Sequence, residues 1–134
     1  MITEDYCSLE VSKLLKEKGF DEFCEYEYGV PKVDGGYVFQ RFFKSIKNSD
    51  LIDEAYTAPT LQMAMKWLRE VHHYYIQVML DSWACGGHLG YYVVIQKTDS
   101  DFEMMLQDAV DEVFYQTYEE ACKAGIKYCL DNLI

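Results

Sequence analysis

Apolar residues recur at helical spacing in three parts of the chain, each with a polar start. The first pattern predicts a helix over residues 4–18, with Thr3 as its N-cap and Gly19 in the left-handed position at its end. A second helix is predicted to begin after Thr60 and another after Thr117, which opens a capping box. The apolar stripes of these helices are Tyr6, Leu9, Val11, Leu14 and Leu15; then Leu61, Ala64, Met65, Leu68 and Val71 or His72; and last Ala121, Ala124, Ile126, Tyr128, Cys129, Leu130 and Leu133.

Aromatic and β-branched runs between these helices predict two antiparallel hairpins. The runs span residues 23–28, 37–42, 74–83 and 91–97. The first pair is separated by a segment that contains Pro31 and Gly35-Gly36, and the second pair by the glycine-containing loop 84–90. Strand alternation places Ile76, Val78 and Leu80 on one side, with Gln77, Met79 and Asp81 on the other.

The segment from Phe102 to Phe114 has two interpretations. Its apolar positions keep a helical rhythm, but residues 113–115 fit a short strand equally well. Either interpretation gives an α+β fold with an antiparallel sheet of about four strands and three or four packed helices. A chain of 134 residues, half of them hydrophobic, is predicted to form one domain over residues 1–134.

The charge balance makes direct nucleic-acid binding unfavourable. The chain has 12 basic and 23 acidic residues and a net charge of −11, so its field repels a phosphate backbone. Between Thr98 and Cys122 there is no Lys or Arg, and this stretch is either a solvated face or a surface for a basic partner. Its acidic residues are Asp99, Asp101, Glu103, Asp108, Asp111, Glu112, Glu119 and Glu120. From this stretch we select Asp108, Asp111 and Glu112 as candidate binding residues.

The sequence predicts a cytoplasmic protein with reduced thiols. No apolar run is long enough to span a membrane, and residues 1–5 lack the basic and apolar regions of a signal peptide. The five cysteines form an odd set without a C-x-x-C pair, which is unlike a disulfide framework or a zinc site. Cys122 and Cys129 lie two helical turns apart and are predicted to pack in the core.

Candidate chemistry is limited to one pair of side chains. Adjacent histidines on a helix point about 100° apart, so His72 and His73 cannot chelate one metal ion from a regular helix. Cys85 and His88 are the candidates for nucleophilic catalysis, although a hairpin turn explains the intervening Gly86-Gly87 better. We therefore expect no metal and no cofactor.

Tyrosines are unusually frequent and concentrate on or beside the predicted strands. The chain has 12 of them, and Tyr91 and Tyr92 begin the last predicted strand of the second hairpin. Because tyrosine combines apolar area with a polar tip, it is common at protein interfaces. Tyr91 and Tyr92 are therefore candidate binding residues on a Tyr-rich sheet, which would meet a protein partner or another copy.

Five segments resemble a family of small uncharacterised proteins. They are TAPTLQMAMKWLRE at 57–70, MITEDYCS at 1–8, LLKEKGFD at 14–21, QTYEEA at 116–121 and KYCL at 127–130. The family is encoded in gut Bacteroidales genomes, often near prophage or mobile-element genes. The resemblance covers about half of the chain and implies a bacterial or phage origin and an accessory role, with no functional residues to transfer.

Together these features favour a non-enzymatic interaction protein of a phage or mobile element. It would bind a protein partner through the Tyr-rich sheet or the acidic surface, and one version has the acidic face imitate DNA. Self-association is a further expectation. The alternative is a small cysteine-dependent enzyme or ligand-binding domain centred on Cys85 and His88, which an unusually low Cys85 pKa would support.

Overall fold

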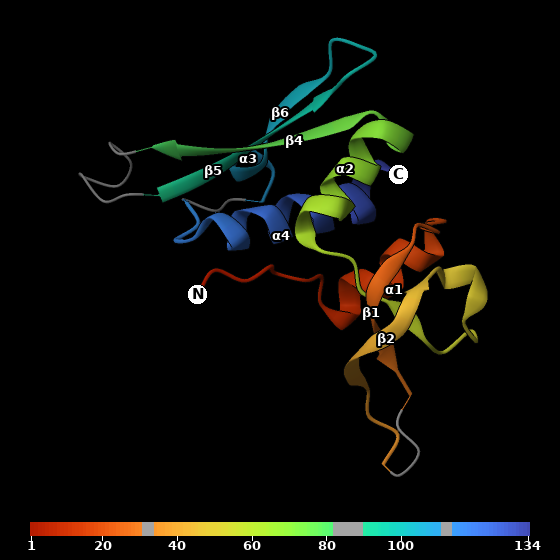
Figure 1. Ribbon diagram of the computed structural model, residues 1–134. Coiled ribbons are helices and arrows are strands. Elements are labelled where there is room, and N and C mark those ends of the chain that lie inside the picture. The colour runs from red at the N-terminus through yellow and green to blue at the C-terminus, as the bar shows by residue number, and fades with distance from the viewer. Residues whose placement is uncertain (31–33, 82–89, 111–113) are drawn as a thin grey trace. The chain divides into compact units, whose positions relative to one another are not determined.

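The computed structural model describes residues 1–30, 34–81, 90–110 and 114–134 (Figure 1). The chain divides into two compact units, Met1–Thr60 and Leu61–Ile134, and each contains a three-stranded antiparallel sheet. The predicted α+β class is confirmed. In place of one sheet of about four strands, the described residues form two sheets of three strands each. Each predicted hairpin gains one further strand, β3 or β6, which is too short to give a periodic signal in the sequence. The single domain over residues 1–134 stays a prediction.

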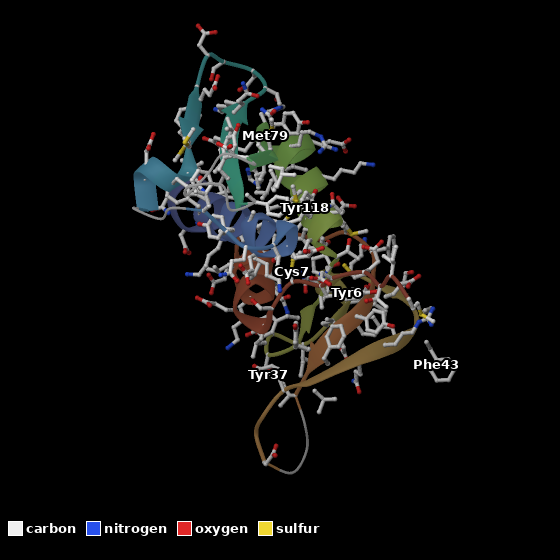
Figure 2. The ribbon with its side chains drawn as sticks, turned by 90° about the vertical axis from the view of Figure 1, so that its left-hand side faces the viewer. Tyr6, Cys7, Tyr37, Phe43, Met79 and Tyr118 are labelled. Atoms are coloured by element: carbon white, nitrogen blue, oxygen red, sulfur yellow. The ribbon has the colours of Figure 1, made fainter. Side chains whose placement is uncertain are left out.

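The first unit combines one helix with a sheet of strand order β2-β1-β3. Its elements are α1 (Leu9–Glu17), β1 (Cys24–Gly29), β2 (Val38–Ile46), the 3-10 turn η1 (Asn48–Asp50) and β3 (Tyr56–Thr57). The predicted hairpin of β1 and β2 is confirmed, but its register is irregular. Tyr26 lies opposite Arg41 whereas Cys24 lies opposite Ile46, so β2 bulges between these pairs. The bulge carries the fully exposed Phe43, which points away from the ribbon in Figure 2.

The first helix starts later than the sequence predicts. It begins at Leu9, and the Ser8 hydroxyl caps it by accepting a hydrogen bond from the Val11 N–H at 3.3 Å. Thr3 was therefore wrong as the N-cap. The preceding residues are extended because the Cys7 N–H donates to the Pro59 carbonyl at 2.9 Å. The predicted end is confirmed, since Gly19 has a φ of +94°.

A buried asparagine connects separate parts of the first unit. The Asn48 side chain donates to the Phe20 carbonyl at 2.8 Å, and its oxygen accepts from the Thr57 N–H at 2.9 Å. Asn48 is only 4% exposed, so water cannot replace these bonds readily. One side chain thus satisfies two backbone groups that lie 28 and 9 residues away from it.

The second unit has a sheet of strand order β4-β5-β6 and three helices. Its elements are α2 (Leu61–His72), β4 (Tyr74–Asp81), β5 (Gly90–Lys97), β6 (Glu103–Met105), α3 (Leu106–Val110), α4 (Tyr118–Tyr128) and a closing π-helical turn (Cys129–Leu133).

The helix predicted after Thr60 and the hairpin of β4 and β5 are confirmed. In the ambiguous segment, the helical interpretation is confirmed only for α3 and is wrong for Glu103–Met105, which form β6. Of the predicted strand 113–115, Tyr115 forms an isolated bridge with Tyr91, and residue 113 lies outside the described residues. Thr117 caps α4 by accepting from the Glu120 N–H at 3.1 Å.

Gly125 brings α4 very close to the sheet. A Cβ atom at this position would lie 2.8 Å from the Ile76 Cγ2 atom and 3.3 Å from the Val93 Cγ1 atom. Any larger residue would therefore push the helix away from β4 and β5. Ile76, Val93 and Ile95 are at most 3% exposed, and they form the centre of this unit's core with the buried face of α4.

We predict that Asn48→Ala destabilises the first unit by about 2 to 4 kcal/mol, because it leaves a buried carbonyl and a buried N–H without partners. Urea unfolding monitored by circular dichroism measures the loss, and hydrogen exchange assigns it to residues 1–60. Ser45→Ala is the control, since Ser45 is exposed on the neighbouring strand. A loss below about 0.5 kcal/mol would contradict the structural role of Asn48.

Candidate functional site

The sheet of the second unit has two unlike faces. In the β4–β5 register, Ile76 lies opposite Ile95 and Val78 opposite Val93, and this face packs against α4. Figure 1 shows α2, α3 and α4 on this same side of the sheet. Side chains alternate along a strand, so the intervening residues of β4, β5 and β6 point to the opposite side. We call that side the open face, because no described helix of this unit covers it.

The open face is rich in large apolar and aromatic side chains. Tyr75, Met79 and Met105 are 42%, 41% and 42% exposed, respectively. The register places Tyr92 opposite Met79 and Met105 opposite Val94, so these side chains adjoin across the three strands. The Phe114 ring extends the patch, with its centroid 6.2 Å from that of Tyr92. The members are Tyr75, Met79, Tyr92, Val94, Met105 and Phe114.

A row of polar side chains crosses the same face. The Gln77 side-chain amide donates to the Gln96 side-chain oxygen, and the Gln96 amide donates to a Glu103 carboxylate oxygen at 3.2 Å. This row links all three strands. The Gln96 hydrogen bond also fixes the position of the Glu103 carboxylate. The polar side chains of the open face are thus held in place by hydrogen bonds between residues of the sheet.

One end of the open face is hollowed and acidic. A shallow hollow of about 420 Å³ lies between the Tyr75 ring and the turn that joins β5 to β6. Asp101 and Glu103 line it, together with Lys97, whose ammonium group lies 3.8 Å from the Asp99 carboxylate. Lys97 is the one basic residue in the described parts of β4, β5 and β6. The carboxylates around it make the local balance negative.

The structure separates the two tyrosines that the sequence grouped as binding residues. Tyr92 lies on the open face. Tyr91 lies on the helix-covered face, where its ring meets the Tyr118 ring edge to face at 6.3 Å. The backbone of Tyr91 also pairs with Tyr115 through two hydrogen bonds of 2.8 Å. Adjacent strand residues cannot share one face, so only Tyr92 belongs to this site.

Of the acidic candidates, Asp108 is exposed on α3, directly after β6. Asp111 and Glu112 lie outside the described residues, as do Cys85 and His88. Five residues of the open face were not predicted from the sequence as site residues: Tyr75, Met79, Val94, Met105 and Phe114. The β4 alternation already placed Met79 away from the core side, but no sequence signal showed that the described helices all lie on the other face.

The four described cysteines have buried side chains. They are Cys7, Cys24, Cys122 and Cys129, and the last two occupy the core of the second unit as predicted. Burial raises the pKa of the Cys24 thiol to about 11 and that of the Cys129 thiol to about 12. Neither Cys24 nor Cys129 is therefore an activated nucleophile near neutral pH.

Metal sites and membrane-spanning helices are both absent from residues 1–30, 34–81, 90–110 and 114–134. No group of three or more His, Cys, Asp or Glu side chains is arranged to hold a metal ion there. Every helix in those ranges is too short or too polar to cross a lipid bilayer.

No protein-family model, curated protein or solved structure matches this chain.

We predict that Cys24 and Cys129 stay unmodified when the native protein is treated with iodoacetamide at about pH 8, because burial keeps both as neutral thiols. Peptide mass spectrometry after the treatment measures the modified fraction of each cysteine. Both should react once urea unfolds the chain, which serves as the internal control. Rapid modification of either thiol in the native protein would contradict its burial, whereas rapid modification confined to Cys85 would support the cysteine-dependent alternative.

Proposed function

We propose that this protein is a non-enzymatic interaction module that binds a protein partner through the open face of β4, β5 and β6. The observation that carries the proposal is the contiguous apolar and aromatic patch of Tyr75, Met79, Tyr92, Val94, Met105 and Phe114. Three of these side chains are about two-fifths exposed. Exposed apolar patches of this kind mark binding surfaces, and Tyr and Met are enriched in interface centres.

The charge around the patch defines the chemistry of the partner. Glu103 lies on the open face, Asp101 lines its hollow, and Asp108 follows β6. Residues 98–122 contain no Lys or Arg, so Lys97 is the one basic side chain among those that line the hollow. A matching surface has an apolar centre with arginine or lysine at its margin. The net charge of −11 adds long-range attraction toward such a basic surface.

The acidic surface ends near Arg69, whose guanidinium group carries a positive charge. Its central carbon lies 5.9 Å from the centroid of the Tyr75 ring, so positive charge borders the patch at the start of β4. The acidic margin is thus on the β6 side of the open face. We propose that the basic residues of the partner lie over β6 and its turns, while its apolar centre covers Met79 and Tyr92.

The resemblance to Bacteroidales proteins suggests where the partner should be sought. We propose an accessory role for a phage or mobile element in such a cell, with a host or phage protein as the natural partner. A lysate of that cell is therefore the source for capture. Retention counts as support only where substitutions on the open face abolish it and substitutions elsewhere do not.

We predict that Met79→Ser combined with Met105→Ser weakens binding of a defined probe, an amphipathic helical peptide with a leucine face and arginine margins, by about tenfold. Both substitutions remove apolar contact without changing charge. Fluorescence anisotropy of the labelled peptide measures the affinity. Val71→Ser is the matched control, because Val71 is exposed on α2 and lies outside the open face. Equal losses in the control and the double variant would show that the open face is not the binding surface.

We further predict that Asp101→Asn, Glu103→Gln and Asp108→Asn together weaken the same probe by roughly tenfold at low salt, with the difference shrinking as salt screens the charges. The control carries Glu17→Gln, Glu22→Gln and Glu54→Gln in residues 1–60, which change the net charge equally. Affinity titrations at increasing salt compare the two variants. If both triple variants lose the same affinity, the attraction comes from net charge and not from the margin of the open face.

A further inference from the structure

The edges of the two sheets differ in how they are protected against pairing. In the first unit, β2 has a bulge and carries Arg41 and Lys44, and β3 has only two residues. In the second unit, β6 has three residues and includes Glu103. Bulges, charges and short length are the usual means by which proteins prevent an edge strand from pairing with another chain. Three of the four edges in the described chain have such protection.

The fourth edge, β4, has eight residues and no bulge, and its one charged residue is Asp81 at its end. Its pairing with β5 runs without irregularity from Tyr74 to Asp81. The seven residues from Tyr74 to Leu80, YYIQVML, include no charge, proline or glycine. No described strand pairs with the other side of β4, and Tyr75, Met79 and Leu80 are 42%, 41% and 55% exposed. A long, regular and uncharged edge strand is a template for another strand.

Hydrogen bonds of β5 reveal which backbone groups of β4 point outward. Tyr91 pairs with Tyr115, and the Lys97 N–H donates to the Phe102 carbonyl, so the odd-numbered residues of β5 bond away from β4. The even-numbered residues of β5 therefore bond to their β4 partners, which are Tyr75, Gln77 and Met79. The backbone N–H and C=O groups that point outward from β4 belong to Tyr74, Ile76, Val78 and Leu80.

We propose that β4 pairs in antiparallel fashion with β4 of a second copy of this chain, which joins the two sheets of the second unit into one continuous sheet. The two-fold axis passes through Gln77, so Ile76 lies opposite Val78 and Tyr74 opposite Leu80 of the other copy. These are the residues whose backbone groups point outward. The pairing forms about eight backbone hydrogen bonds.

The sequence of β4 is complementary to itself in this register. On the helix-covered face, Tyr74 meets Leu80 and Ile76 meets Val78. On the open face, Tyr75 meets Met79 and the two Gln77 amides face each other. Every cross-strand pair is uncharged, and aromatic and β-branched residues take part in most of them, which favours pairing. No like charges meet, although each copy has a net charge of −11.

The expected arrangement is isologous, because each copy uses the same strand as donor and acceptor. It also places the two open faces on the same side of the joined sheet, since both copies keep their helices on the other side. The patch that contains Tyr75, Met79 and Tyr92 would then be doubled. The β4 pairing itself does not require that any partner binds there.

The experiment uses oppositely charged substitutions at the two-fold axis. In wild-type protein we expect a dimer by sedimentation velocity. Gln77→Lys and Gln77→Glu each place like charges opposite each other, and each should raise the dimer dissociation constant by about tenfold. An equimolar mixture of the two variants should restore dimers, because lysine then faces glutamate. A monomeric wild type at all accessible concentrations would overturn the proposal, and a mixture that stays monomeric would overturn the Gln77 register.

A second pair of variants tests the backbone hydrogen bonds directly. Val78→Pro removes an outward N–H while the bonds between β4 and β5 remain, so it should abolish the dimer. Val78→Ala is the matched control, because it shortens the side chain but keeps the N–H, and it should still dimerise. Circular dichroism checks that both variants fold. If folded Val78→Pro still dimerises, pairing through β4 is refuted.

Salt separates this proposal from the proposed function. Dimerisation brings together two chains of net charge −11 through an uncharged edge, so added salt should strengthen it by screening their repulsion. Binding of a basic partner by the acidic margin should weaken under the same conditions. The Met79→Ser and Met105→Ser variant should still dimerise, because it keeps every outward backbone N–H and C=O group of β4. Either proposal can therefore fail while the other survives.

Discussion

The close packing of α4 on the sheet at Gly125 is the constraint on which the second unit depends. With no side chain at this position, the helix approaches until Ile76 and Val93 lie in contact distance of its backbone. That contact buries one face of β4 and β5 and fills the core with Ile95, Leu106 and Ile126, each at most 1% exposed. The described helices of this unit, α2, α3 and α4, lie on that side, so none of them covers the apolar residues on the other side.

Hydrogen bonding keeps the uncovered side ordered. The row of Gln77, Gln96 and Glu103 links the three strands, and side-chain networks of this kind restrict the positions of their neighbours. Tyr92, Met79 and Met105 are thus presented by a regular sheet and not by a loop. A surface that is ordered before binding loses less conformational entropy when a partner covers it. This preorganisation is the physical reason to regard the open face as a binding surface.

The acidic composition affects the two proposed contacts in opposite ways. Carboxylates at Asp101 and Glu103 attract a basic partner to one end of the open face, while the same negative charge opposes association of two copies. The strand that we propose to join two copies is the uncharged run from Tyr74 to Leu80. The chain therefore separates its charged surface from its uncharged edge within a single sheet, and we expect salt to have opposite effects on the two proposed contacts.

Local patterns in the sequence by themselves determined much of the structure. Apolar spacing and capping residues identified the helix after Thr60, the Thr117 cap and the end of the first helix at Gly19, because these depend on neighbouring residues. Strand alternation correctly placed Ile76 and Met79 on opposite faces of β4.

Tertiary structure alone decided the start of the first helix, since the Cys7 backbone pairs with Pro59 far along the chain. It also decided that β3 and β6 complete separate sheets and that Tyr91 and Tyr92 lie on different faces. Among the described helices of the second unit, none covers the face with Tyr92. Those outcomes depend on which segments pack together, and local periodicity carries no information about long-range pairing.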